Sequence, residues 1–155
     1  HFEVKAETLR HLADAASKGR IVAVGTTSVR TLESLPVLGY RTLRDGSPLE
    51  EEHIGQWEAY DIPDEYSGAD LLNALADYMT AHDMDKIKTA TQIMIMPGFR
   101  YRLVQGMVTN FHQPKSTLLL LVSAFIGDDW HRVYDYALSN GFRFLSYGDS
   151  SLLLR

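Results

Sequence analysis

The chain has no cysteine among its 155 residues, which excludes a disulfide framework and metal sites built on thiolates. Its longest uninterrupted apolar run covers only residues 118–122, far short of the ~20 residues that a membrane-spanning helix needs, and no signal-peptide pattern opens the sequence. The histidines lack the spacing of metal ligands: they lie at positions 1, 11, 53, 82, 112 and 131. We therefore expect a cytoplasmic, metal-free protein with no membrane role.

Lysine and arginine are absent from residues 45–85, where twelve of the twenty acidic residues lie. The net charge of −5 argues against a nucleic-acid partner, but the other 114 residues carry fifteen basic and eight acidic groups, a net charge of +7. If residues 45–66 project as a loop, the remaining body can present a basic face to a phosphate backbone, with Arg100 and Arg102 on one face of a strand. Alternatively, the acidic run and both arginines are simply solvated surface.

The length suits one ordinary domain with a sizeable core. We expect residues 1–155 to form a single α/β domain, with residues 37–66 as an acidic loop insertion. The first residue is His1 and not methionine, and a helical pattern follows almost at once. We therefore expect this domain to be the C-terminal fragment of a longer enzyme.

Apolar spacing predicts alternating helices and strands. Helices are expected over residues 5–18, 29–35, 67–82 and 130–139, and a buried helix is expected to follow Pro114. Strands are expected over residues 21–24, 57–62, 92–96, 100–104, 107–109 and 142–145. This alternation predicts an α/β fold, a layered α/β/α domain with a mixed, partly parallel sheet.

Three polar clusters follow expected strands, at the sheet edge where open α/β sheets bind ligands. A glycine, hydroxyl groups and helix N–H groups suit a carboxylate, phosphate or sugar hydroxyl. Each cluster also has a plain reading, in which Lys115 is solvated, Ser116 only caps its helix and His112 is structural. The clusters are Gly25, Thr26, Thr27, Ser28 and Arg30; Asn110, Phe111, His112, Lys115, Ser116 and Thr117; and Ser146, Tyr147, Gly148 and Asp149.

The letters PKST over residues 114–117 invite comparison with a phosphate-binding P-loop. The nearest upstream glycine is Gly106, and a strand-like stretch separates it from Lys115. Without the glycine-rich loop that wraps phosphates, a nucleotide triphosphatase is disfavoured.

Three segments together carry a specific resemblance. The sequences GTTSVRTLES (residues 25–34), PGFRYRLVQGMVTNFHQPKSTLLLLVSAF (97–125) and GFRFLSYGD (141–149) resemble the signature segments of the S-adenosylmethionine:tRNA ribosyltransferase-isomerase family of queuosine biosynthesis. The resemblance runs from about Phe2 to Leu154, is weakest over residues 37–90, and corresponds to the C-terminal part of a member. Gln113 departs from the leucine of many members, and Gln92 and Met96 replace a frequent aspartate and tyrosine.

The resemblance implies transfer of the ribosyl moiety of S-adenosylmethionine onto 7-aminomethyl-7-deazaguanine in tRNA, giving epoxyqueuosine. The co-substrate would be S-adenosylmethionine without a metal, the macromolecular partner would be tRNA, and the fragment would be inactive alone. Because the sulfonium acidifies the C5′ protons, such a site needs a general base, and the ordinary pKa of histidine near 6.5 suits that role. Alternatives are a nucleotide- or sugar-binding module without turnover and a purely structural domain.

The resemblance also implies roles for individual residues. His112 would shuttle the proton, and Asp149 would face the adenine or the incoming amine, unless it is a loop residue in an Asx-type turn. Lys115 or Arg30 would bind a carboxylate or phosphate. The remaining contacts to the co-substrate would come from Asn110, Ser116 and Thr117 on the ribose hydroxyls and from Gly25, Thr26, Thr27, Ser28 and Tyr147.

Overall fold

The structure, a computed structural model, describes residues 1–49, 53–145 and 148–155. Helices and strands alternate along it, which confirms the expected α/β class. The elements are β1 (Phe2–Lys5), α1 (Ala6–Ser17), β2 (Val22–Val24), α2 (Thr26–Asp45), β3 (His53–Ile54), the 3-10 helix η1 (Glu58–Asp61), α3 (Gly68–Ala81), β4 (Lys86–Thr91), β5 (Gly106–Asn110), α4 (Thr117–Ile126), α5 (Asp129–Ser139) and β6 (Ser150–Leu154).

The strands form two mixed, three-stranded sheets rather than one. In the first sheet, ordered β1-β4-β3, β4 is antiparallel to β1 and parallel to β3. In the second sheet, ordered β2-β5-β6, β5 is parallel to β2 and antiparallel to β6. Both sheets are thus partly parallel, as expected.

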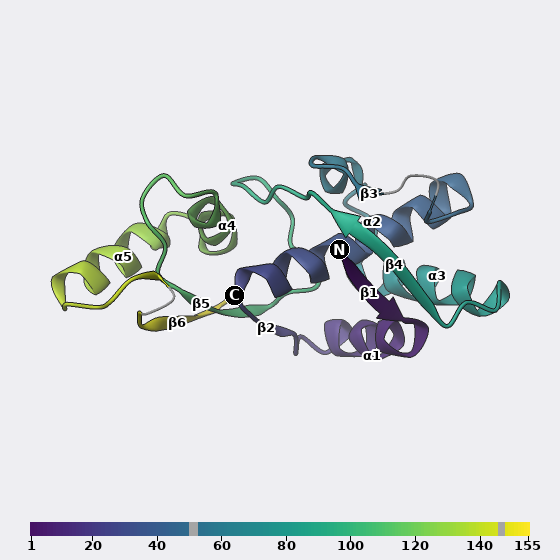
Figure 1. Cartoon of the computed structure of the whole chain (residues 1–155), viewed down its shortest axis with the longest axis horizontal. Coiled ribbons are helices and arrows are strands. Elements are labelled where there is room, and N and C mark those ends of the chain that lie inside the picture. The colour runs from purple at the N-terminus through teal and green to yellow at the C-terminus, as the bar shows by residue number, and fades with distance from the viewer. Residues whose placement is uncertain (50–52, 146–147) are drawn as a thin grey trace.

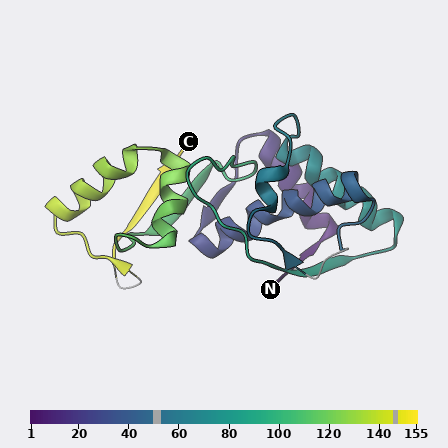
Figure 2. The same cartoon turned by 90° about the horizontal axis from the view of Figure 1, so that it is seen from above.

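Each sheet belongs to its own lobe of an elongated molecule (Figures 1 and 2). The first lobe contains the first sheet with α1, η1 and α3, and the second lobe contains the second sheet with α4 and α5. Helix α2 starts directly after β2 and runs through the middle of the molecule into the first lobe (Figure 1). It therefore connects the two lobes.

Helix α2 is longer than the sequence predicted. The helix expected to stop at Pro36 continues to Asp45, so residues 37–45 are not a loop. An interior proline costs about 3 kcal/mol. The cost is offset because the next turn packs tightly: Leu38 is fully buried, and a Cβ on Gly39 would lie 2.1 Å from the carbonyl oxygen of Leu71 in α3.

Several expected strands are wrong. Residues 57–62 contain η1, and residues 92–96, 100–104 and 142–145 lie outside the strands. Four observed strands, β1, β3, β4 and β6, had not been expected. Residues 92–96 are extended, since the amides of Gln92 and Met94 donate to Ile54 O and Gln56 O, each at 2.9 Å, but they form no continuous ladder.

The expected helices over residues 5–18, 67–82 and 130–139 are confirmed as α1, α3 and α5. Ser67 caps α3 by accepting a hydrogen bond from the Asp70 amide at 3.1 Å. Helix α4 begins three residues after Pro114, and it is buried on one face only, because Leu120 is 39% exposed. No helix in the described ranges is both long and apolar enough to cross a membrane.

Candidate functional site

The described residues of the three polar clusters lie at one end of the second sheet. The amide of Gly25, just after β2, donates to Val108 O of β5 at 2.8 Å. At the other side of β5, Asn110 pairs with Ser150, the residue that follows Asp149. The carboxyl ends of the parallel strands β2 and β5 therefore lie side by side, as expected from the carboxyl-end rule, and the start of the antiparallel strand β6 lies beside them.

Gly25 makes the sharp exit from β2 into α2. Its φ of +90° lies in a region that costs other residues conformational strain. Its carbonyl accepts the first bond of α2, from the Val29 amide at 3.2 Å. The side chains of Thr27 and Ser28 are exposed on this first turn.

His112 lies buried beside β5. Its Nε2 is 3.0 Å from Thr109 Oγ1, and its amide donates to the Tyr134 hydroxyl oxygen at 2.9 Å. Nδ1 has no hydrogen-bond partner among the described residues. Burial lowers the pKa of His112, so the neutral imidazole dominates at neutral pH and can accept a proton.

The same burial predicts a pH dependence of stability. A lowered pKa means that His112 contributes stability above its ordinary pKa near 6.5, and that this contribution is lost as the pH falls through the folded value. Denaturant titrations between pH 7.5 and 5 should therefore show a steeper loss for wild type than for His112→Asn. A variant of the exposed His11, His11→Asn, should keep the wild-type slope; equal slopes in all three proteins would contradict this assignment.

The side chain of Asp149 contacts Arg143, a residue of the same loop. Its carboxylate accepts a hydrogen bond from the Arg143 amide at 2.9 Å and lies 3.4 Å from the Arg143 guanidinium. These two contacts lower the pKa of Asp149. The Arg143 amide lies six residues before Asp149, so this contact is not the Asx-type turn that the sequence offered as the alternative. Tyr147 and Ser146 lie outside the described residues.

Asn110 and Arg30 are placed differently within the cluster. Asn110 Oδ1 accepts a hydrogen bond from Ser150 Oγ at 2.8 Å, which fixes the amide at the junction of β5 and β6. Arg30 projects from α2, and its Nε is a buried atom without a hydrogen-bond partner in the described part of the chain. Ser116 caps α4 by accepting from the Leu118 amide at 3.1 Å, while Lys115 and Thr117 are exposed.

The predicted binding residues line two separate hollows. A hollow of about 260 Å³ lies at α4 and is lined by Lys115, Ser116, Leu119, Leu120, Ser123 and Trp130. A hollow of about 400 Å³ lies beside β2 and is lined by Val22, Ala23, Val24, Thr27, Ser28, Thr31 and Leu32. The structure thus brings the clusters to one sheet end without joining them in one cavity. Residues 1–49, 53–145 and 148–155 contain no group of three acidic or histidine side chains that could hold a metal.

Glu33 is a buried residue of this region that the sequence analysis missed. Its carboxylate accepts hydrogen bonds from the amides of Arg102, Leu103 and Val104 at 3.0, 2.9 and 2.8 Å. Burial raises the pKa of Glu33, although the three amides act in the opposite direction. Its spacing in the sequence could have predicted its burial, because Glu33 follows Val29 by four residues and so lies on the same, buried face of α2.

The two arginines expected to meet tRNA phosphates are engaged within the chain. The Arg102 guanidinium donates to Ile62 O at 3.0 Å and Pro63 O at 3.3 Å, and Arg100 pairs with Asp64 at 3.2 Å. Neither lies on a strand. Both instead bind oxygen atoms at the end of the acidic stretch, in residues 62–64.

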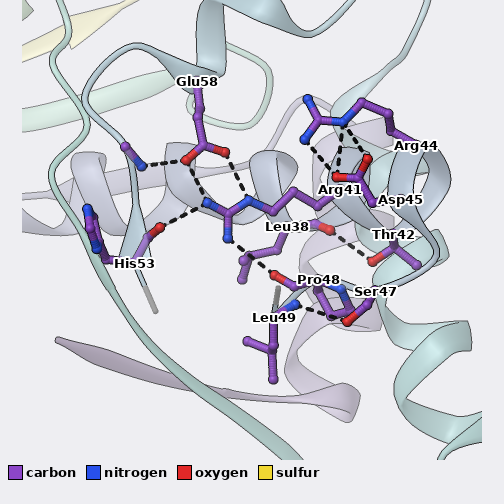
Figure 3. Close-up of polar contacts among 11 residues, drawn as sticks. Leu38, Arg41, Thr42, Arg44, Asp45, Ser47, Pro48, Leu49, His53 and Glu58 are labelled. Atoms are coloured by element: carbon purple, nitrogen blue, oxygen red, sulfur yellow. Dashed lines mark hydrogen bonds and ion pairs between the residues drawn. The ribbon is translucent and has the colours of Figure 1, made fainter. Parts of the chain in front are cut away.

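Arg41 fixes the start of that acidic stretch (Figure 3). Its buried guanidinium makes a bidentate pair with Glu58, at 2.9 and 2.6 Å, and donates to His53 O at 2.9 Å and Pro48 O at 3.3 Å. Glu58 in turn accepts from the Gly55 amide at 2.6 Å. The described parts of residues 45–66 therefore pack on α2 and do not project as a loop.

Comparisons with known proteins agree on one family. The family model described as queuosine biosynthesis protein matches residues 1–153. Relatives named S-adenosylmethionine:tRNA ribosyltransferase-isomerase come from Thermotoga maritima, 36% identical over 99% of this chain, and Rhizobium meliloti, 39% identical over 88%. The crystal structure of the S-adenosylmethionine tRNA ribosyltransferase from Thermotoga maritima matches 98% of this chain with a TM-score of 0.63 and 32% identity.

The match covers a limited part of each relative. The chain spans 33% of the Thermotoga maritima relative's sequence, 27% of the Rhizobium meliloti relative's and 40% of the crystallised chain. The matched part is the C-terminal part of the relatives. This chain therefore belongs to the queuosine biosynthesis protein family and corresponds to about the C-terminal third of its relatives.

Proposed function

We propose that this chain is the C-terminal part of a cytoplasmic S-adenosylmethionine:tRNA ribosyltransferase-isomerase. The reaction would move the ribosyl moiety of S-adenosylmethionine onto 7-aminomethyl-7-deazaguanine in tRNA and release adenine and methionine, giving epoxyqueuosine. The observation that carries the proposal is the meeting of the Gly25, Asn110 and Ser150 ends of three strands beside a buried, neutral histidine. This arrangement can hold a ribose and accept a proton.

His112 is the proposed proton acceptor. The sulfonium of the co-substrate acidifies its C5′ protons, and a neutral imidazole near this sheet end can remove one of them. Thr109, bonded to Nε2, holds the ring so that Nδ1 is the nitrogen left for the exchange. The hydrogen bond from the His112 amide to Tyr134 fixes the backbone at the same point.

The surrounding residues would bind the co-substrate. Asn110, Ser116 and Thr117 would contact the ribose hydroxyls, and the exposed Lys115 or the partly buried Arg30 would meet the methionine carboxylate or a tRNA phosphate. Gly25, Thr26, Thr27, Ser28 and Tyr147 would complete the contacts. Asp149 would act on the adenine or the amine only if its bonds to Arg143 open.

Nucleoside mass spectrometry tests the reaction directly. We would incubate tRNA bearing 7-aminomethyl-7-deazaguanine with S-adenosylmethionine and either this chain or a full-length family protein that carries it. Epoxyqueuosine formed by the full-length protein and not by this chain is the expected result, because two thirds of the relatives' length lies outside the match. A folded full-length protein that forms no product, but still binds S-adenosylmethionine, would favour a binding module.

Replacing His112 tests its role in that full-length protein. Removal of a general base typically costs 10²- to 10⁴-fold in rate, so His112→Ala should lower kcat on the order of 100-fold while leaving the KM for S-adenosylmethionine nearly unchanged. His11→Ala, on the exposed face of α1, is the matched control and should keep full activity. An unchanged kcat in His112→Ala would remove His112 from the chemistry.

A further inference from the structure

The second sheet has one apolar face that nothing in the described chain covers. Ala23, Met107 and Leu153 are cross-strand partners whose side chains are all buried. Figure 1 shows α4 and α5 on one side of this sheet and no helix on the other. The alternate residues of β2 and β6 point to that open side: Val22, Val24, Leu152 and Leu154 are 49%, 69%, 59% and 66% exposed.

These side chains form one continuous surface, which we call the open face. The register aligns Val22 with Gly106 and Leu154, and it aligns Val24 with Val108 and Leu152. A Cβ added to Gly106 would lie 3.0 Å from Leu154 and 3.2 Å from Val22, so both side chains close over the glycine. Contiguous exposed apolar surface of this kind marks an interaction site.

The backbone of β2 provides a second feature of the same surface. Ile21 O accepts from the Gly106 amide and the Gly25 amide donates to Val108 O, so residues 21 and 25 direct their backbone groups toward β5. In a parallel pair the intervening residues Val22 and Val24 point the other way. β2 is the last strand of the order β2-β5-β6, so this edge has no neighbour among the described strands. Unpaired strand edges of this type accept another strand.

The surroundings of this edge select the kind of partner. The hollow of about 400 Å³ beside β2 is lined only by aliphatic and hydroxyl side chains, and it contains no charged residue. A phosphate backbone or an anionic cofactor would find no counter-charge there, whereas a strand with branched apolar side chains would find both hydrogen-bond partners and a matching surface. We therefore expect the partner at this edge to be a polypeptide.

We propose that the open face and the free edge of β2 bind the N-terminal part of the same family protein, which adds a strand beside β2 and covers Val24 and Leu152. Such a segment exists in the relatives, because this chain spans only 33% of the Thermotoga maritima sequence and matches its C-terminal part. A covalently linked segment is present at high effective concentration, which favours it over a separate partner.

Hydrogen exchange distinguishes the bound edge from the free one. We would measure exchange at the Val22 and Val24 amides in this 155-residue chain alone and in a full-length family protein that carries it. The expected result is fast exchange in the chain alone and exchange slowed by about tenfold or more in the full-length protein. Equally fast exchange in both would overturn the proposal.

A substitution tests the surface independently. Val24→Lys should leave the far-UV circular dichroism of the chain alone unchanged, because the side chain is already exposed, but it should make the full-length protein at least about tenfold more sensitive to proteolysis. Leu43→Lys, at a residue 51% exposed in the first lobe, is the matched control and should change neither the circular dichroism of the chain alone nor the proteolysis of the full-length protein. A full-length Val24→Lys protein that resists proteolysis like wild type would contradict docking at this face.

Self-association is the competing outcome. Light scattering of the chain over a range of concentrations would detect a dimer. If the amides of Val22 and Val24 become protected only with dimerisation, and remain unprotected in the monomeric full-length protein, the occupant is a second copy and the proposal is wrong. This outcome is independent of the epoxyqueuosine assay, so the docking surface and the proposed reaction can fail separately.

Discussion

Replacing Glu33 with alanine is expected to lower the free energy of unfolding by about 4 kcal/mol. The substitution removes the carboxylate that accepts from the amides of Arg102, Leu103 and Val104. A buried donor left without an acceptor costs roughly 1–3 kcal/mol, and three lose theirs together. Since a typical domain is stable by only about 5–15 kcal/mol, urea denaturation should show a clearly lowered midpoint.

The variant Glu33→Gln keeps the shape of the side chain but removes its charge, so it shows how much of the stability depends on the charge. Its carbonyl oxygen can still accept from Leu103 and Val104, but its amide group meets the Arg102 amide with a donor. We expect an intermediate loss of stability. Glu7→Ala, an exposed glutamate in the first turn of α1, is the matched control and should change stability by less than about 0.5 kcal/mol. If Glu33→Ala is as stable as Glu7→Ala, the three amides have found other acceptors.

Replacing Arg41 with alanine is expected to cost about 3–5 kcal/mol. The guanidinium is buried, and its loss leaves the Glu58 carboxylate without its bidentate partner and His53 O without its donor (Figure 3). Breaking a buried pair by removing one partner typically costs about 3–5 kcal/mol because the remaining charge is uncompensated, and since the Glu58 side chain is 25% exposed we expect the lower end of this range. Thermal and urea unfolding should both report the loss, and proteolysis should begin within residues 45–66.

Two variants at neighbouring positions make this test specific. Arg44→Ala removes an exposed arginine that pairs with the adjacent Asp45 and lies 5.4 Å from the centre of the Tyr40 ring, and it should cost about 1 kcal/mol or less. Arg41→Lys keeps the charge but cannot form the bidentate pair, so it should lie between wild type and Arg41→Ala. Equal stability of Arg41→Ala and Arg44→Ala would show that the acidic stretch is held by other contacts.

Helical periodicity predicted the helices well because their stability comes from local patterns. The apolar stripe of α3 and its Ser67 cap are both visible in the sequence, and both are present in the structure. Pro36 misled the prediction, since its local cost is offset by the packing of Leu38 and the close approach of Gly39 to Leu71. Such an offset depends on another helix and has no local signature.

The strands were harder to predict because distant groups determine them. Residues 100–104 have a strand-like composition, but Glu33 satisfies the amides of Leu103 and Val104, so that stretch needs no strand ladder. Conversely, β4 has exposed lysines at Lys86 and Lys88 and was missed, although Ile87 between them is buried. In both cases the deciding contact lies outside the window that a pattern can cover.

The candidate site was predictable in position but not in detail. The carboxyl-end rule placed the Gly25 and Asn110 clusters after strands, and both follow strands in the structure, β2 and β5. The third cluster was expected after a strand over residues 142–145, but Asp149 instead precedes β6, whose start pairs with Asn110. It could not reveal that Asp149 bonds to Arg143, or that Lys115 and Thr27 line different hollows. These features depend on side-chain directions, which follow from packing rather than from spacing.

The paired strands β2 and β5 lie far apart in the sequence, and this has a consequence for synthesis on the ribosome. Ile21 bonds to Gln105, 84 positions later, and α2, α3 and β4 lie between them. At about 5–20 residues per second, β2 leaves the ribosome several seconds before its partner exists. The first lobe can condense in that interval, so α2 would hold a lone, unpaired β2 at its end. A nascent chain stalled before residue 106 should therefore expose this strand to chaperones until β5 emerges.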